Sequence, residues 1–211
     1  MSLGKKIFGL GFLILAVTAP GCENWNEDEQ VWEQMTDKQK QQRLMLRIDR
    51  NYADADAQSM LGDLYLKKGK FEDAIYQYKV ALSYDPVHFS AQTGMVKTHK
   101  EMGKTSQAQT TAELYINEVY NSAEKLLELG RAFEKRKLDN YTLQCYKRAM
   151  RLDPESPEVF KRLGFFYLKK ANKALAEEYL RKSFNLDPYQ SDVNYQLGQL
   201  DVEIGMGEKT E

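Results

Sequence analysis

The chain has 211 residues, of which 42% are hydrophobic and 29% are charged, and its formal net charge is −1. This composition is typical of one ordinary soluble domain and excludes a disordered chain. Because nucleic-acid-binding domains are usually strongly basic, nucleic acid is not an expected partner.

The first predicted segment, residues 1–21, has the features of an export signal. Two lysines precede an apolar run of thirteen residues, which is shorter than the roughly twenty that cross a hydrocarbon core. Small residues then lead to Cys22, and this end resembles the lipobox of bacterial lipoproteins. The resemblance implies that Cys22 is acylated, with palmitate among its chains, and becomes the first residue after cleavage. The alternative is a plain secretory signal in which Cys22 has no role.

A lipid anchor on Cys22 would tether the protein to a membrane, since two or three acyl chains hold a protein far more firmly than one. Glu23 follows the cysteine, whereas an aspartate there marks retention in the inner membrane of enteric bacteria. The resemblance therefore implies the bacterial cell envelope, at the periplasmic face of the outer membrane. Residues 22–28 would be a short tether.

The next segment, residues 29–54, is predicted to be an N-terminal helical cap or a degenerate half-repeat. Its apolar residues, among them Trp32, Leu44 and Ile48, suggest one or two amphipathic helices. Residues 38–51 fall where the second helix of a repeat would lie.

The dipeptide Leu-Gly sets the organisation of the remaining chain. It occurs at residues 61–62, 129–130, 163–164 and 197–198, in steps of 68, 34 and 34 residues, and Asp-Pro follows the same steps. A fixed period of this length indicates stacked supersecondary units. Such arrays present extended binding surfaces to partners.

Each unit is predicted to be an antiparallel pair of helices. In the first unit a helical apolar pattern stops near Gly69, resumes at Ala74 and ends before Pro86, which cannot continue a helix. The pattern resembles the tetratricopeptide repeat, which has small, aromatic and proline residues at fixed positions. The matching framework residues are Gly62, Tyr65, Ala74, Tyr78, Ala81, Pro86, Gly130, Phe133, Tyr146, Ala149, Pro154, Gly164, Tyr167, Ala176 and Pro188.

The resemblance implies an all-α fold, an α-solenoid of tandem helix-turn-helix tetratricopeptide units. The second unit is degenerate because Val96 and His99 stand where a small residue and an aromatic are expected. The expected divisions are repeats at 55–88, 89–122, 123–156 and 157–190, a capping helix at 191–204 and a tail at 205–211.

In this family the first helix of each repeat lines a concave groove that binds a peptide or helix of a protein partner. The groove is therefore expected to be basic in its middle and apolar toward its C-terminal end. Phe165, outside the repeat framework, is expected to lie under a partner or under the N-terminal segment. The implied groove residues are Asp63, Leu66, Lys97, Lys100, Leu127, Arg131, Lys135, Lys161, Phe165, Leu168 and Tyr195.

No phosphate loop, paired-cysteine metal motif or nucleophile elbow occurs in the sequence, so no enzyme activity, metal or cofactor is expected. Cys145 is expected to be a buried or half-buried free thiol. The leading hypothesis is a non-catalytic, membrane-tethered adaptor that assembles or localises a cell-envelope complex. It resembles lipoproteins that serve as pilotins of type IV pili or as adaptors for hydrolases. The alternative is a self-associating structural protein of the periplasm, with a homodimer formed through the second repeat or the cap.

Overall fold

The computed structural model describes residues 31–207, with side chains described for residues 31–200. The chain divides into two units, Met1–Lys40 and Gln41–Glu211, and each is described by itself. The predicted signal sequence, Cys22 and the tether lie outside the described residues.

Helix α2 (Asp37–Arg50) begins at a capping box formed by Thr36 and Gln39. The Thr36 backbone N–H donates to Oε1 of Gln39 at 2.9 Å, and the Gln39 backbone N–H donates to Oγ1 of Thr36 at 3.3 Å. Two N–H groups that the helix itself leaves unpaired are thereby satisfied. This explains why α2 starts at Asp37.

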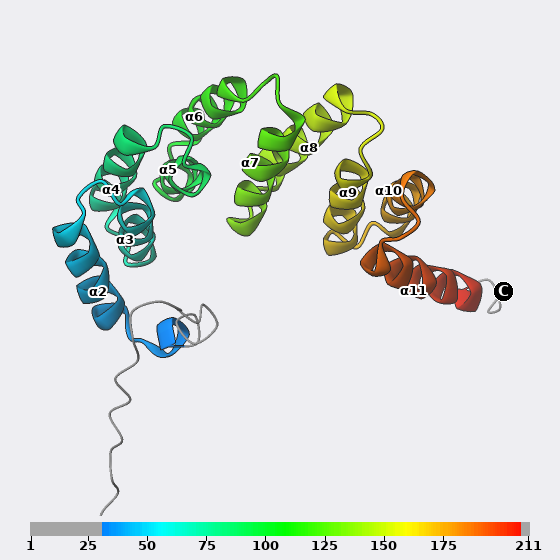
Figure 1. The fold of residues 1–211 in the computed structure, drawn as a ribbon, viewed down its shortest axis with the longest axis horizontal. Coiled ribbons are helices and arrows are strands. Elements are labelled where there is room, and N and C mark those ends of the chain that lie inside the picture. The colour runs from blue at the N-terminus through cyan, green and yellow to red at the C-terminus, as the bar shows by residue number, and fades with distance from the viewer. Residues whose placement is uncertain (1–30, 208–211) are drawn as a thin grey trace, which may run out of the picture. The chain divides into compact units, whose positions relative to one another are not determined.

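The chain then forms four consecutive helix pairs and a final single helix (Figure 1). Within each pair the second helix packs against the first, and each pair contacts the next one along the chain. The helices are α3 (Ala55–Lys67), α4 (Phe71–Tyr84), α5 (Phe89–Glu101), α6 (Thr105–Glu118), α7 (Ala123–Lys135), α8 (Asp139–Leu152), α9 (Pro157–Lys169), α10 (Lys173–Leu186) and α11 (Ser191–Gly207). No strand occurs between residues 31 and 207. The predicted all-α solenoid of helix pairs is confirmed.

The helix bounds repeat with the 34-residue step of the sequence. First helices begin at residues 55, 89, 123, 157 and 191, and second helices begin at residues 37, 71, 105, 139 and 173. Helix α2 therefore stands in the position of a second helix. Helix α11 stands in the position of a first helix, and it continues to Gly207, beyond the predicted end at 204.

Three of the framework positions require glycine, because a side chain of the partner helix occupies the space that a Cβ would need. A Cβ on Gly62 would lie 2.7 Å from Cε1 of Tyr78, and one on Gly164 would lie 2.6 Å from Cδ2 of Leu180. Gly130 is blocked in the same way by Tyr146. The glycines therefore permit close approach of the paired helices.

The degenerate second repeat keeps a packed interior despite its altered sequence. Val96 and Ala112 are fully buried, and Tyr115 packs beside Met95, with its hydroxyl 3.2 Å from the sulfur. Gly94, two residues before Val96, meets the ring of Tyr78 from the preceding pair. Gly94 of the second repeat thus allows the second pair to pack closely against Tyr78 of the first pair.

The core runs continuously through the first three pairs and into α9, and it contains Cys145. Burial raises the pKa of the Cys145 thiol to about 12. The reactive form of cysteine is the thiolate, so this side chain is inert at neutral pH. The expectation of a buried free thiol is confirmed.

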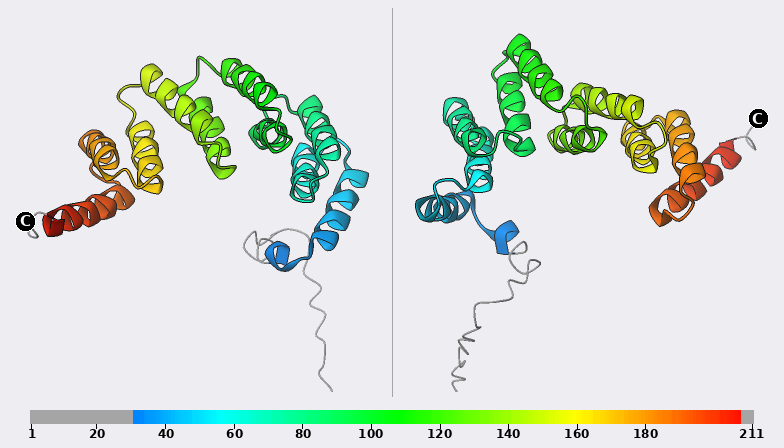
Figure 2. Two further views of the ribbon diagram at one scale, coloured as in Figure 1. Left: turned by 180° about the vertical axis from the view of Figure 1, so that it is seen from behind. Right: turned by 45° about the horizontal axis from the view of Figure 1, so that its top comes forward.

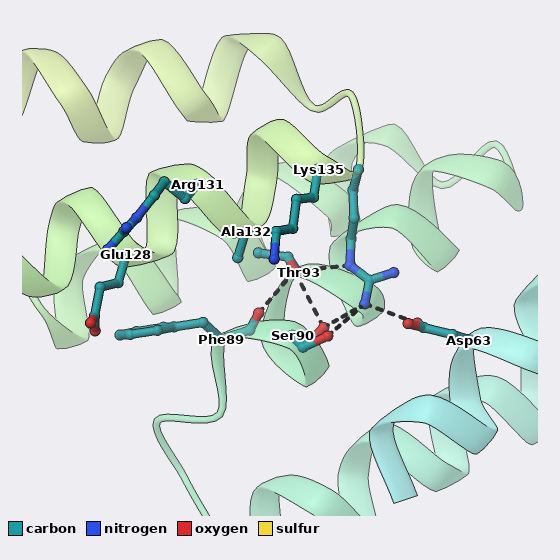
Figure 3. A pocket seen from close by; sticks show the side chains of 9 residues that line it. Asp63, Phe89, Ser90, Thr93, Glu128, Arg131, Ala132 and Lys135 are labelled. Carbon is teal, nitrogen blue, oxygen red and sulfur yellow. Dashed lines mark hydrogen bonds and ion pairs between the residues drawn. The ribbon is translucent and has the colours of Figure 1, made fainter. Parts of the chain in front are cut away.

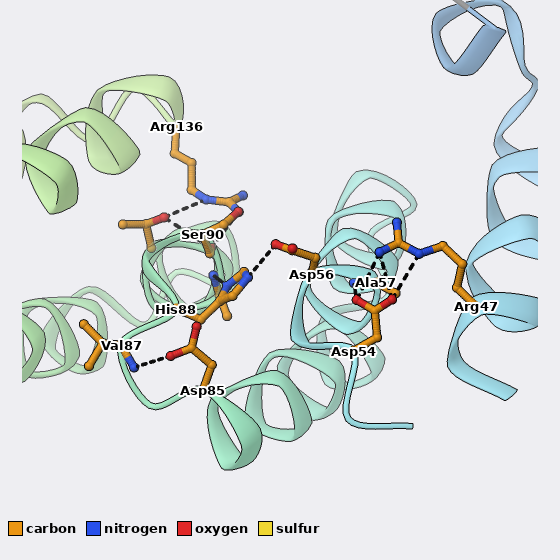
Figure 4. A network of polar contacts seen from close by, with 11 residues as sticks. Arg47, Asp54, Asp56, Ala57, Asp85, Val87, His88, Ser90 and Arg136 are labelled. Atoms are coloured by element: carbon orange, nitrogen blue, oxygen red, sulfur yellow. Dashed lines mark hydrogen bonds and ion pairs between the residues drawn. The ribbon is translucent and has the colours of Figure 1, made fainter. Parts of the chain in front are cut away.

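Polar side chains fix the junctions between neighbouring pairs (Figure 4). Asp54 caps α3 by accepting from the backbone N–H of Ala57 at 2.9 Å, and its Oδ2 pairs with Arg47 of α2 at 2.8 Å. His88 caps α5 through Nδ1, and its Nε2 contacts Asp56 of α3 at 2.9 Å. Because Nδ1 accepts from a backbone N–H, Nε2 carries the proton and donates to Asp56.

We expect His99 to make stability depend on pH. Its half-buried ring has Nδ1 without a partner among the described residues, and burial, followed by Lys104 and Lys79, lowers its pKa. The folded state therefore binds fewer protons than the unfolded state, whose histidine has a pKa of about 6.5. The free energy of unfolding is therefore highest above pH 7, where His99 is neutral in both states, and it declines as the pH falls through 6.5. Urea unfolding at pH 7.5 and 5.5 should show this decline in the wild type and a smaller one in His99→Phe. Equal declines in both proteins would contradict the assignment.

Candidate functional site

The candidate site is a groove between the first helices of neighbouring repeats, here called the central groove (Figure 3). It has a volume of about 630 Å³, and α5 and α7 supply all but two of its lining residues. The groove is lined by Asp63, Phe89, Ser90, Thr93, Glu128, Arg131, Ala132, Lys135 and Arg136.

Arg136 joins three helices at the edge of the central groove. Its Nε donates to Oγ1 of Thr93 at 2.9 Å, and its Nη2 donates to the backbone carbonyl of Ser90 at 2.8 Å. The same nitrogen pairs with Oδ1 of Asp63 on α3 at 2.9 Å. The side chain of Arg136 is only 13% exposed. Arg136 therefore acts as a strut that holds α3, α5 and the end of α7 together.

Asp63 is fixed from a second direction by Tyr78. The Tyr78 hydroxyl donates to Oδ1 of Asp63 at 2.5 Å, and the guanidinium of Arg136 lies 5.8 Å from the centre of the Tyr78 ring. Burial, and then the negative charge of Asp63, raises the pKa of Tyr78, so its hydroxyl stays protonated and donates. On this side of the groove, the polar groups of Asp63, Tyr78 and Arg136 are thus paired with one another.

The charges that remain for a partner lie on α7. Arg131 and Lys135 are exposed, and they are spaced by one turn of the helix. Because Arg136 is neutralised by Asp63, the groove offers these two cations against the single carboxylate of Glu128. The ring of Phe89 provides an apolar surface beside them (Figure 3). This arrangement suits a protein segment that carries both an acidic and an apolar side chain.

Only three of the sequence-predicted groove residues meet in the central groove, namely Asp63, Arg131 and Lys135. Lys100 lines a separate hollow of about 210 Å³ beside α8. Lys97 forms an ion pair with Glu101 at 2.6 Å. The remaining two residues of the first three repeats contribute to packing, since Leu127 belongs to the core and Leu66 packs against it.

The prediction for the C-terminal end of the groove is wrong in its account of Phe165. Phe165 and Leu168 pack against a cluster formed by Leu180, Val193, Leu197 and Leu200. Helix α11 of the same chain supplies three of these residues, so neither a partner nor the N-terminal segment is needed as cover. The cap reaches the face of α9 that the repeat frame assigns to the groove.

Lys161 is also engaged by α11 instead of facing an open groove. Its Nζ lies 3.1 Å from Oδ2 of Asp192 and 3.6 Å from Oε2 of Glu158. Tyr195 remains 64% exposed on α11. The structure therefore separates the C-terminal residues of the predicted groove from the central ones.

Sequence reasoning missed Arg136, Ser90 and Phe89. Arg136 follows the last residue of α7, outside the helix positions that line the groove in this kind of repeat. Its partners Thr93, Ser90 and Asp63 lie 43, 46 and 73 residues earlier in the chain. The repeat period does not show which residues of the preceding repeats a long side chain contacts. The aromatic side chain at the first position of α5 was the one available sign for Phe89.

Within residues 31–200, where side chains are described, no group of three or more His, Cys, Asp or Glu side chains could hold a metal ion. In the same part of the chain, no helix has the length and apolar character to cross a membrane.

Two family models match the chain. Residues 158–190 match the model described as tetratricopeptide repeat, and residues 55–151 match the model described as TT21 fifth ARM repeats domain. The first match covers α9 and α10, whose geometry the other pairs repeat. The chain contains a tetratricopeptide repeat at residues 158–190. It is thus a helical-repeat scaffold of the kind that binds other proteins.

Among curated proteins, the chain is similar to Protein O-mannosyl-transferase TMTC1 of Homo sapiens. The two are 25% identical over 153 residues, and the matched region is 72% of this chain and 17% of the relative. The chain is 28% identical over 103 residues to TPR repeat protein oca3 of Schizosaccharomyces pombe, which covers 48% of this chain and 36% of the relative. The chain thus spans about a sixth to about a third of the length of these relatives.

Among solved structures, the chain is similar to PilF of Pseudomonas aeruginosa. The identity is 26%, the match covers 75% of this chain and 72% of the other, and the TM-score is 0.42.

Proposed function

We propose that this protein is a non-catalytic scaffold that is tethered to a membrane of the bacterial cell envelope. It binds a segment of another protein and so assembles or localises an envelope complex. The membrane is the outer membrane, at its periplasmic face, and the anchor is the acylated Cys22. The lipobox-like end of the apolar N-terminal run supports the anchor.

The observation that carries the binding function is the central groove with its exposed pair, Arg131 and Lys135, beside Phe89. The groove stands on fixed elements, because the strut of Arg136 joins the helices around it. A preorganised site costs less to bind, since fewer side chains must be ordered on association. Arg and aromatic side chains are also enriched among the residues that dominate protein interfaces.

Reversing the groove charge should abolish partner binding. The tethered chain, with the double substitution Arg131→Glu and Lys135→Glu, is expected to lose the envelope proteins that the wild type captures from a detergent extract. The loss should be at least about tenfold, because each lost close charge pair costs on the order of 1.5 kcal/mol or more. Quantitative mass spectrometry of the captured proteins is the measurement.

The matched control is Lys147→Glu, which changes the same kind of charge on the exposed side of α8. It should retain every captured protein. Capture that is equal in the groove variant and the wild type would refute binding in the central groove.

Substitution of Cys22 should release the protein from the membrane. Cys22→Ser removes the sulfur that an acyl chain needs, so the variant should leave the membrane fraction and take up no labelled palmitate. The reason is that no other acylation site follows the small residues of the lipobox-like segment. The wild type should sediment with outer-membrane markers. A Cys22→Ser variant that still sediments with membranes would show that acylation is not the anchor.

A further inference from the structure

A second hollow, here called the tyrosine hollow, lies among α2, α3 and α4 and has a volume of about 250 Å³. Figure 2 shows these three helices next to one another in blue to cyan. Three tyrosines from three segments line it, namely Tyr52 from the turn after α2, Tyr65 from α3 and Tyr76 from α4. All lining residues belong to the unit Gln41–Glu211. Because the hollow is smaller than the usual pocket for a drug-sized molecule, it suits a single side chain.

Two of these tyrosines present their rings to solvent. Tyr52 is 53% exposed and Tyr76 is 57% exposed. Tyr52 is nevertheless held in place, since its ring meets that of Tyr84 edge-on at 6.0 Å and its carbonyl accepts from Nε2 of Gln58 at 3.2 Å. The face of an aromatic ring carries partial negative charge and attracts cations. The tyrosines therefore favour a positively charged ligand.

Two hydrogen-bond acceptors without a partner line the same hollow. The side chain of Asp49 is exposed, and it forms no ion pair or hydrogen bond with any residue between 31 and 200. Gln58 is only 2% exposed, and its Oε1 accepts no hydrogen bond within the same range, whereas its Nε2 is used by Tyr52. Among these residues no basic side chain lines the hollow, so its formal charge is that of Asp49.

Cations close to the tyrosine hollow are engaged outside it. Arg47, on the same helix as Asp49, pairs with Asp54 at 2.8 Å. The Nζ of Lys70 lies 5.9 Å from the centre of the Tyr65 ring, but Lys70 does not line the hollow. The contact of Lys70 shows that this group of rings accepts a cation. The rings of Tyr52 and Tyr76 remain for a ligand.

We propose that the tyrosine hollow binds an arginine side chain from a segment of another protein. A guanidinium stacks on aromatic rings, and its five N–H donors can serve the carboxylate of Asp49 and the amide oxygen of Gln58 together. A lysine ammonium is compact and strongly hydrated, so it gains less from the rings. This site is separate from the central groove, whose exposed cations favour an acidic segment.

The test is nuclear magnetic resonance of the full chain in non-ionic detergent, with isotope-labelled tyrosine rings. The probe is a short blocked peptide of glycines around one central arginine. The ring signals of Tyr52 and Tyr76 should shift and saturate as the peptide is added. The same peptide with citrulline, which keeps the shape of arginine without its charge, should cause no shift. Tyr76→Leu and Asp49→Asn should each raise the Kd by about two- to fivefold.

Tyr189→Leu is the matched control, since Tyr189 is 93% exposed in the turn before α11 and lies outside the hollow. It should bind the arginine peptide like the wild type. The central-groove variant, with Arg131→Glu and Lys135→Glu, should also bind it normally, which separates this site from the proposed function. Three outcomes would overturn the proposal: no shift of these rings by the arginine peptide, equal shifts by the citrulline peptide, or a Kd that both hollow variants leave unchanged.

Discussion

Replacing Gly164 with leucine should lower the free energy of unfolding by about 1 to 3 kcal/mol, which is the usual cost of overpacking a filled core. A side chain at Gly164 would collide with Leu180, both with its Cδ2 at 2.6 Å and with its backbone nitrogen at 3.2 Å. Because the backbone is involved, α9 and α10 must move apart to relieve the collision. Urea unfolding followed by circular dichroism measures the change.

The control is the same substitution at Gly198, the equivalent position of α11. Nothing lies within 4 Å of a Cβ there, so Gly198→Leu should not lower the free energy of unfolding, and the loss of a glycine inside a helix should raise it by up to about 1 kcal/mol. The contrast separates packing from any general cost of leucine at this repeat position. If Gly164→Leu unfolds at the wild-type denaturant concentration, the interlocked packing of α9 and α10 is wrong.

Removing the strut should have an effect of similar size. Arg136→Met keeps much of the apolar stem but deletes the donors to Thr93 and Ser90 and the ion pair with Asp63. Hydrogen bonds to charged groups contribute about 1.5 to 3 kcal/mol each, and a carboxylate left exposed to water recovers part of that loss. Because the Asp63 side chain is 42% exposed, we expect a total loss of about 1 to 3 kcal/mol.

Arg131→Met is the comparison, since Arg131 lies on the same helix but is exposed. It should change stability by less than about 0.5 kcal/mol. A double-mutant cycle with Asp63→Ala isolates the pair, and its coupling energy should be favourable. Equal stability of the wild type and Arg136→Met would mean that the contacts of the strut add nothing to the fold.

The repeat architecture could be predicted from the sequence because its contacts are local and recur. A glycine such as Gly62 and a tyrosine such as Tyr78 lie in one helix pair, so their spacing is constant and visible in the sequence. The helix bounds follow the same period from Asp37 to the start of α11 at Ser191. The 34-residue period therefore predicts both where the helices begin and which residues pack between them.

The candidate site could be predicted only in part. Arg131 and Lys135 are found by the repeat frame because they lie on the face of α7 that lines the groove. Arg136 lies just past that helix, and its contacts depend on how far a long side chain reaches across to α5 and α3. The cover over Phe165 depends on which side of α9 the terminal helix occupies. A short apolar pattern in α11 does not determine that side.

The central claim is that the groove between α5 and α7 binds a segment of another protein. A photo-activated crosslinking residue placed at Lys135, inside the groove, tests it directly in intact cells. The claim predicts a discrete adduct that is heavier than the protein and that disappears when Arg131→Glu is introduced. The same probe at Lys147, on the exposed side of α8, should give no such adduct. An adduct at Lys147 and none at Lys135 would contradict the claim.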